Sequence, residues 1–132
     1  MGLSQIEFYF TIFDFEGDPD TITRELGLEP SSISRKGIRR RPHLPPARQN
    51  VWTIKSDTLS DISDLQEHWM RLSALLKPRR RMITKLNVGG GKKFTIWLTC
   101  IDGQTGLRLE NDMIDFASKI KAEIEIEFID NE

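Results

Sequence analysis

Apolar and polar residues alternate at both ends of the chain, with the period of two that is typical of β-strands. Residues 5–15 read QIEFYFTIFDF and place four apolar side chains on one face: Ile6, Phe8, Phe10 and Ile12. The opposite face carries further aromatic residues, so we expect much of this strand to be covered on both sides. Residues 123–128 read EIEIEF. This strict alternation predicts a half-buried strand with three glutamates facing solvent: Glu123, Glu125 and Glu127.

Two central segments are also predicted to be strands. Residues 51–55 read VWTIK, and residues 93–101 read KFTIWLTCI. Both are rich in β-branched and aromatic residues, and the second alternates between apolar and polar positions. Cys100, near the end of the second segment, is predicted to be a small core residue.

The intervening segments have the signals of helices. Over residues 18–27, Asp18 suits an N-cap, Pro19 the first helical position and Gly27 the position after the last turn. Apolar residues recur at helical spacing over residues 60–77, and Pro78 is predicted to end that helix, which places the next basic residues in a loop. A third helix is predicted over residues 107–121.

The predicted order is β-α-β-α-β-α-β, in a single α+β domain over residues 1–132. We expect a four-stranded, largely antiparallel sheet with the helices packed on one face, because Glu7 and the glutamates of residues 123–128 require a solvated face. A doubly wound parallel sheet, which is covered on both faces, is the weaker alternative. The length allows a core to form without covalent staples.

Composition places the chain among ordinary globular proteins, with 38% hydrophobic and 30% charged residues. A single cysteine excludes an internal disulfide and fits a reducing cytoplasm. We expect no signal peptide, because no basic segment precedes an apolar stretch at the start. No apolar run approaches 18 residues, so we expect no membrane span.

Charge is strongly segregated, although the net charge is only −1. Residues 1–29 contain one basic and seven acidic side chains, and residues 102–132 contain three basic and nine acidic ones. Residues 30–101 contain fifteen basic and four acidic side chains. Such asymmetry bears on association with charged partners rather than on the fold.

The basic charge is densest over residues 35–48, RKGIRRRPHLPPAR, which contain no acidic residue. Arginine side chains match carboxylates and phosphates, and residues 79–81 would extend the same surface if the two loops meet. The candidate binding residues are Arg35, Lys36, Arg39, Arg40, Arg41, His43, Arg48, Trp52, Arg79, Arg80 and Arg81.

Three interpretations of these residues stay open. Charge runs are most often solvated surface, so two solvated loops are the plainest. An acidic protein partner comes next, followed by the backbone of DNA or RNA. Trp52 is expected to be a core anchor, with stacking on a ligand as the alternative.

Sites for catalysis or metals are not indicated. His43 and His68 are 25 residues apart, with no cysteine or carboxylate at ligand spacing, and His68 is expected on a helix surface. We therefore expect no catalytic residue, no metal and no cofactor.

The run GDPDTITRELGLEP, the Lys36-Gly37 step and the strand residue Trp52 together resemble the domain-of-unknown-function 4279 family. Its first-helix pattern is matched by Asp18, Pro19, Ile22, Thr23, Leu26, Gly27 and Pro30. The resemblance covers nearly the whole chain and implies a small bacterial or phage protein without an assigned catalytic site. The arginine triplet and the Pro-Pro step are not part of that pattern.

We therefore expect a non-enzymatic interaction module of a bacterial or phage cytoplasm, which docks on an acidic protein partner through its basic loop. An immunity or defence-antagonist role would suit such a protein, and DNA or RNA backbone binding is the alternative. A homodimer in which the basic loop meets the acidic strand of residues 123–128 is also left open.

Overall fold

The computed structural model describes residues 5–56, 64–86, 89–100 and 107–130. This part of the chain forms one sheet of five strands in the order β2-β3-β1-β4-β5. The strands are β1 (Gln5–Phe13), β2 (Ser32–Ser34), β3 (Val51–Lys55), β4 (Gly91–Cys100) and β5 (Glu123–Asp130). The helices are α1 (Pro19–Leu26), α2 (Leu65–Leu76), the 3₁₀ helix η1 (Lys77–Arg79), α3 (Arg80–Lys85) and α4 (Asn111–Lys119).

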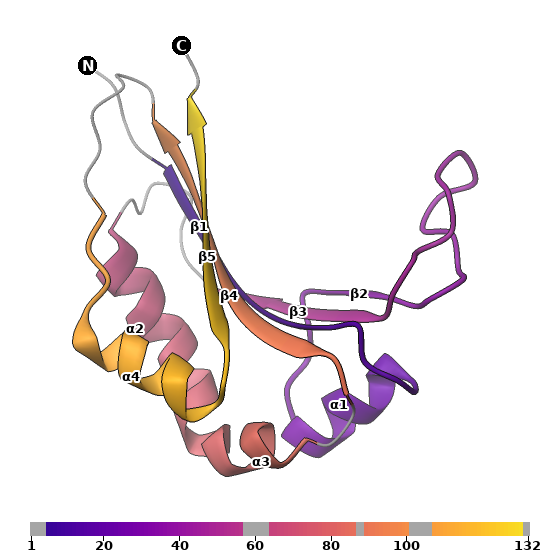
Figure 1. Ribbon diagram of the computed structural model, residues 1–132, viewed down its shortest axis with the longest axis horizontal. Helices are drawn as coiled ribbons and strands as arrows, with labels where there is room; N and C mark the ends of the chain where they lie inside the picture. Colours follow the sequence, from indigo (N-terminus) through magenta and orange to yellow (C-terminus); the bar gives the residue numbers. More distant parts are fainter. Residues whose placement is uncertain (1–4, 57–63, 87–88, 101–106, 131–132) are drawn as a thin grey trace.

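The helices lie on one face of the sheet, and the opposite face is left open (Figure 1). The α+β class and the one-sided arrangement of helices agree with the sequence prediction. The number of strands does not, because β2 was missed: three residues are too short to show a periodic pattern. The sheet is also mixed, since β5 runs parallel to β4 whereas the other neighbours are antiparallel. The segment containing α4 provides the crossover that a parallel pair needs.

The core lies between the sheet and the helices. The predicted inner face of β1 is confirmed, since Phe8 and Phe10 are fully buried and Ile6 and Ile12 nearly so. Phe8 stacks on Phe94 of β4, with ring centroids 5.6 Å apart. Trp69 of α2 meets the same Phe94 ring edge-on at 5.8 Å and so joins the helix layer to the sheet.

The capping residues of α1 act as predicted. The Asp18 side chain accepts a hydrogen bond from the backbone N–H of Asp20 at 3.0 Å, and Pro19 is the first helical residue. Gly27 ends the helix in the left-handed conformation, with φ of +66°.

Helix α2 ends at Leu76, just before Pro78, as predicted, but the expectation that a loop follows was wrong. After α2, the proline lies in the first turn of η1, where its missing N–H costs nothing, and the chain continues directly into α3. Residues 79–81 are therefore helical rather than a loop.

Helices α2 and α4 are shorter than the predicted helices over residues 60–77 and 107–121. Helix α2 begins after the N-cap Asp64, and the predicted residues 60–63 lie outside the described part. Helix α4 starts at Asn111, so residues 107–110 are not helical. The side chain of Cys100 also lies outside the description, so its predicted core position stays a prediction.

His68 is buried rather than on the helix surface, with only 1% of the residue exposed. Its Nδ1 lies 2.6 Å from the hydroxyl oxygen of Ser56, also buried. A buried imidazole needs such a partner.

Among the described helices, none is long and apolar enough to cross a membrane.

Candidate functional site

Residues 35–48 form a projecting hairpin, here called the basic arm, between β2 and β3. Two backbone hydrogen bonds close its base, from Gly37 N to Ala47 O at 2.8 Å and from Ala47 N to Ile38 O at 3.0 Å. A turn near the tip is closed by the bond from Leu44 N to Arg41 O, at 3.0 Å. The arm is thus a structured element with its own backbone hydrogen bonds.

Asn50 fixes the arm to the body of the domain. Its Oδ1 accepts a hydrogen bond from Lys36 N at 2.7 Å. Its Nδ2 donates to the carbonyl oxygens of Phe15 and Gly17, at 2.9 and 3.1 Å. A single amide therefore ties the arm to the loop that leads into α1.

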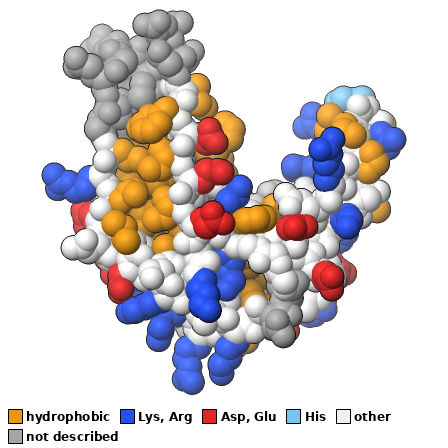
Figure 2. All heavy atoms as spheres, in the orientation of Figure 1, with side chains coloured by type: hydrophobic (Ala, Val, Ile, Leu, Met, Phe, Trp, Pro, Cys, Tyr) orange, Lys and Arg blue, Asp and Glu red, His pale blue; other side chains and the backbone are white. Residues whose placement is uncertain are grey.

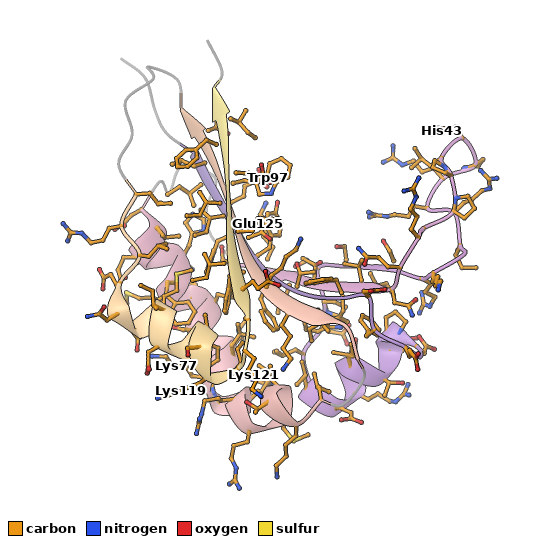
Figure 3. All side chains as sticks on the ribbon, in the orientation of Figure 1. His43, Lys77, Trp97, Lys119, Lys121 and Glu125 are labelled. Atoms are coloured by element: carbon orange, nitrogen blue, oxygen red, sulfur yellow. The ribbon has the colours of Figure 1, made fainter. Side chains whose placement is uncertain are left out.

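The arm stands away from the body and carries His43 at its far end (Figures 1 and 3). Its side chains are almost all exposed, including those of Arg39, Arg40 and Arg41. Two apolar side chains are exposed beside them, Ile38 at 58% and Leu44 at 37%. The surface of the arm is therefore a mixture of guanidinium groups and apolar side chains.

Only one of the arm's arginines has an acidic partner in the described part of the chain. Arg35, at the base, pairs with Asp20 at 3.0 Å and with Asp18 at 3.5 Å. The other arginines of the arm form no ion pair with a described carboxylate: Arg39, Arg40, Arg41 and Arg48. Arg39 donates instead to the carbonyl oxygen of Leu44, within the arm.

The second predicted basic cluster does not join the arm. Residues 79–81 lie on η1 and α3, at the opposite end of the molecule from the tip of the arm (Figure 1). Arg79 is half-buried and donates to backbone carbonyls of α1 and α2, whereas Arg80 and Arg81 are exposed. The structure therefore separates the predicted binding residues into two places.

Trp52 lies in the core, with no exposed surface. Its indole Nε1 donates to the Thr23 hydroxyl at 3.0 Å and so links β3 to α1. The expected role as a core anchor agrees with this position, and the ring offers no surface for stacking on a ligand.

The open face of the sheet contains a groove of about 400 Å³. Three aromatic side chains line it, Tyr9 and Phe13 from β1 and Trp97 from β4. Trp97 is 43% exposed. The sequence carried a signal for this groove, because these residues occupy the odd-numbered positions of both strands. In β1 the aromatic residues opposite the inner face were taken to mean that much of the strand is covered on both sides. Thr11 on this face is buried and Tyr9 and Phe13 are half-buried, but the described helices all cover the other face of the sheet (Figure 1).

Charged side chains of the groove are arranged in pairs. Glu7 accepts a hydrogen bond from the Tyr9 hydroxyl and lies 3.4 Å from Lys55 Nζ. The Tyr9 hydrogen bond first, and Lys55 second, hold the pKa of Glu7 below its usual value. Burial and the neighbouring Glu7 raise the pKa of Tyr9, so the phenol stays protonated.

A second pair lies across β4 and β5. Lys93 Nζ is 3.4 Å from Glu125 and lies over the Phe13 ring, 5.1 Å from its centroid. In the same way, Lys55 Nζ lies 5.8 Å from the centroid of Tyr9. Two of the three aromatic rings thus already have a cation in place.

Metal binding is not indicated by the described residues, among which no three histidine, cysteine or acidic side chains form a group that could hold an ion.

The comparison with known families gives a match along almost the whole chain. The family model "Domain of unknown function (DUF4279)" matches residues 4–131. The chain belongs to this family. No curated protein and no solved structure matches the sequence. Within the run that carried the resemblance, Asp18 and Gly27 cap α1, and Leu26 is buried in the core. The exposed charged and aromatic side chains described above lie instead on the basic arm and in the groove of this DUF4279 protein.

Proposed function

We propose that this DUF4279 protein is a non-enzymatic interaction module, which docks on an acidic surface of a partner protein through the basic arm. The observation that carries the proposal is the arginine triplet of residues 39–41. These three side chains are consecutive and exposed on an arm with its own backbone hydrogen bonds, and no carboxylate of the described residues pairs with them. Like charges held together repel one another, and partner carboxylates would offset that repulsion.

A protein partner is favoured over a nucleic-acid backbone by the apolar side chains of the arm. Ile38 and Leu44 stand exposed next to the arginines. Protein interfaces combine arginine with apolar contacts, whereas non-specific binding to nucleic-acid phosphates depends mainly on positive charge and does not need exposed apolar side chains. We place this docking in a bacterial or phage cytoplasm, with a toxin or defence protein as the class of partner.

The test compares two variants that remove similar charge from different places. Arg39→Ala/Arg40→Ala/Arg41→Ala removes the triplet, and Arg80→Ala/Arg81→Ala removes exposed arginines from α3. Purified proteins are coupled to beads and used to capture partners from a nuclease-treated lysate, and captured proteins are identified by mass spectrometry. We expect acidic proteins to be retained by wild type and by the α3 variant and lost by the arm variant. Capture that is unchanged in the arm variant would overturn the proposal.

Two further measurements complete the test. Both variants should remain within about 1 kcal/mol of the wild-type unfolding free energy, because the substituted side chains are exposed. Binding to a short random-sequence DNA duplex and to RNA is measured at low and moderate salt. Binding that weakens with a log–log slope of about −0.9 for each phosphate contacted would instead support the nucleic-acid alternative.

A further inference from the structure

The arm and the open face of the sheet form two sides of one hollow. Figure 2 shows the hollow between the body and the arm, with acidic side chains on the body side and lysine and arginine side chains on the arm. Figure 3 shows Glu125 and Trp97 pointing from the sheet toward this space. The acidic side is formed by strand β5, whose exposed acidic residues include Glu123, Glu125 and Glu127. The end of the same strand also exposes Phe128 and Ile129. The glutamates of β5 and the arginines of the arm therefore have opposite charge, and Lys93 is a basic residue of the groove itself.

Trp97 is the part of the groove best suited to an incoming arginine. In the sheet it lies between Glu7 on β1 and Glu127 on β5, which are its register partners. In contrast to Tyr9 and Phe13, its ring has no lysine or arginine of the described residues over it. Glu7 already pairs with Lys55, whereas Glu127 has no cationic partner among the described residues. An exposed indole beside such a carboxylate suits a guanidinium group, which stacks on the ring and pairs with Glu127.

We propose that this groove receives the basic arm of a second copy of the chain. In the resulting dimer, each arm lies against strand β5 of the other copy, and the arginines of residues 39–41 meet Trp97 and the glutamates of β5. The inference rests on the proposed function in one respect, because it gives the arm an acidic protein surface as its partner. It adds that a second copy carries such a surface.

Charge complementarity selects a second copy as the occupant. Among the described residues, Glu123, Glu127 and the Trp97 ring have no cationic partner, whereas Glu7 and Glu125 already pair with Lys55 and Lys93. The arm contains no carboxylate, and Arg39, Arg40 and Arg41 pair with none of the described acids, so the unpaired groups of the two surfaces are complementary. Each copy offers both surfaces, so two copies related by a two-fold axis would form the contact twice and close the assembly at two chains.

Pairing between two β5 strands is the other route to a dimer, and the glutamates oppose it. Glu123, Glu125 and Glu127 on one edge strand would face the same residues of the partner strand, and like charges opposite each other are destabilising. When the arm docks instead, the same glutamates face arginines of opposite charge, which is favourable.

The first experiment measures the mass of the purified full chain in solution. Size-exclusion chromatography with light scattering, over a range of concentrations, should show a dimer that dissociates on dilution and at high salt, where exposed charges are screened. Trp97→Ala should weaken the dimer about tenfold or more, as loss of a central aromatic contact does. A wild-type protein that stays monomeric at every concentration would overturn the inference.

The second experiment reverses the charge of each surface separately. Arg40→Glu/Arg41→Glu makes the arm acidic, and Glu125→Lys/Glu127→Lys makes the groove basic. We expect each variant alone to be monomeric. An equimolar mixture should form a heterodimer, because both contacts in the mixed pair again join opposite charges. Native mass spectrometry distinguishes the heterodimer from either homodimer. Dimers that persist in both separate variants would contradict the proposed contact.

Two controls keep the result interpretable. Glu25→Lys/Glu29→Lys reverses two exposed acidic residues on and beyond α1, and this variant should dimerise like wild type.

If a reversed variant fails to fold, acrylamide quenching of tryptophan fluorescence in the wild-type protein decides whether the dimer covers Trp97. Trp52 and Trp69 are buried, so quenching reports mainly on Trp97. Quenching should fall as the protein is concentrated, and quenching independent of concentration would overturn the inference.

Failure of the dimer and failure of the proposed function are distinguishable. The groove variant Glu125→Lys/Glu127→Lys should lose the dimer but still capture the partner protein, because its arm is intact. A monomeric wild type that still captures acidic proteins through the arm would overturn only the dimer. If the chain forms the dimer but the arm variant still captures acidic proteins, only the proposed docking of the arm on a different protein would be overturned.

Discussion

The Arg79 side chain donates a hydrogen bond from Nε to the carbonyl oxygen of Leu26, at 2.6 Å. The same guanidinium donates from Nη1 to the carbonyl oxygen of Leu75 at 2.8 Å, and from Nη2 to that of Gly27 at 3.4 Å. These carbonyl groups lie at the C-terminal ends of α1 and α2. The last carbonyl groups of a helix have no N–H partner within the helix. One arginine thus caps two helices and joins them.

Arg79→Met is expected to lower the unfolding free energy by about 2–4 kcal/mol, because hydrogen bonds from a charged donor are lost and the carbonyls are left unsatisfied. Urea denaturation measures the change. Arg80→Met is the matched control, since the neighbouring side chain is exposed, and it should change stability by no more than about 0.5 kcal/mol. Equal effects of the two substitutions would show that capping by Arg79 contributes little.

A second cross-element contact predicts a pH dependence. The Asp112 carboxylate of α4 accepts hydrogen bonds from Lys77 Nζ at 2.7 Å and from Trp69 Nε1 at 2.7 Å. The Lys77 bond first, and the Trp69 bond second, hold the pKa of Asp112 below its usual value. A lowered folded-state pKa gives stability that is full above the unfolded pKa, near about 4, and is lost as pH falls through the folded value.

The measurement is the difference in unfolding free energy between wild type and Asp112→Asn as a function of pH. The difference should be constant from about pH 7 to about pH 5 and should shrink below about pH 4. Asp115→Asn is the control, because Asp115 pairs only with Lys119 at the surface among the described residues, at 3.0 Å. A difference that does not change down to about pH 3 would contradict this account.

The buried pair of Ser56 and His68 gives a third prediction. Ser56→Ala removes the hydroxyl 2.6 Å from His68 Nδ1 and leaves that nitrogen without this partner. The expected loss of stability is about 1–3 kcal/mol, the cost of an unsatisfied buried polar group. Thermal or urea unfolding tests it against Ser118→Ala, an exposed serine of α4 that should tolerate the change. A loss no larger than that of the control would mean that water or another group replaces the hydroxyl.

Local signals in the sequence were sufficient for much of the fold. Alternation identified β1 and β5, and the cap residues Asp18 and Gly27 fixed the ends of α1, because these features depend only on neighbours in the chain. The parallel pairing of β4 with β5 depends on where a crossover places a strand, and a local pattern does not contain that information.

The candidate site was predicted only in part for the same reason. The charge of the arm is visible in the sequence, but whether an arginine meets carbonyls or solvent depends on distant elements. Arg79 and Arg80 are adjacent and chemically identical, yet only Arg79 reaches the end of α1. Trp97 and Trp52 both lie in strands, and the face that each occupies decides whether the ring is exposed or buried.

Gly89 and Gly90 lie in the turn directly before β4. Both glycines have a positive φ, +75° and +71°, which strains any residue with a Cβ. A Cβ at Gly90 would lie 2.1 Å from the carbonyl oxygen of Phe13, whereas a Cβ at Gly89 would meet nothing within 4 Å. Gly89→Ala should therefore cost about 1 kcal/mol, from backbone strain alone. Gly90→Ala should cost at least about 2 kcal/mol more, because the Phe13 backbone at the end of β1 has to move. Urea denaturation of the two variants separates the effects, and equal losses would show that β1 and the turn approach each other less closely than these positions indicate.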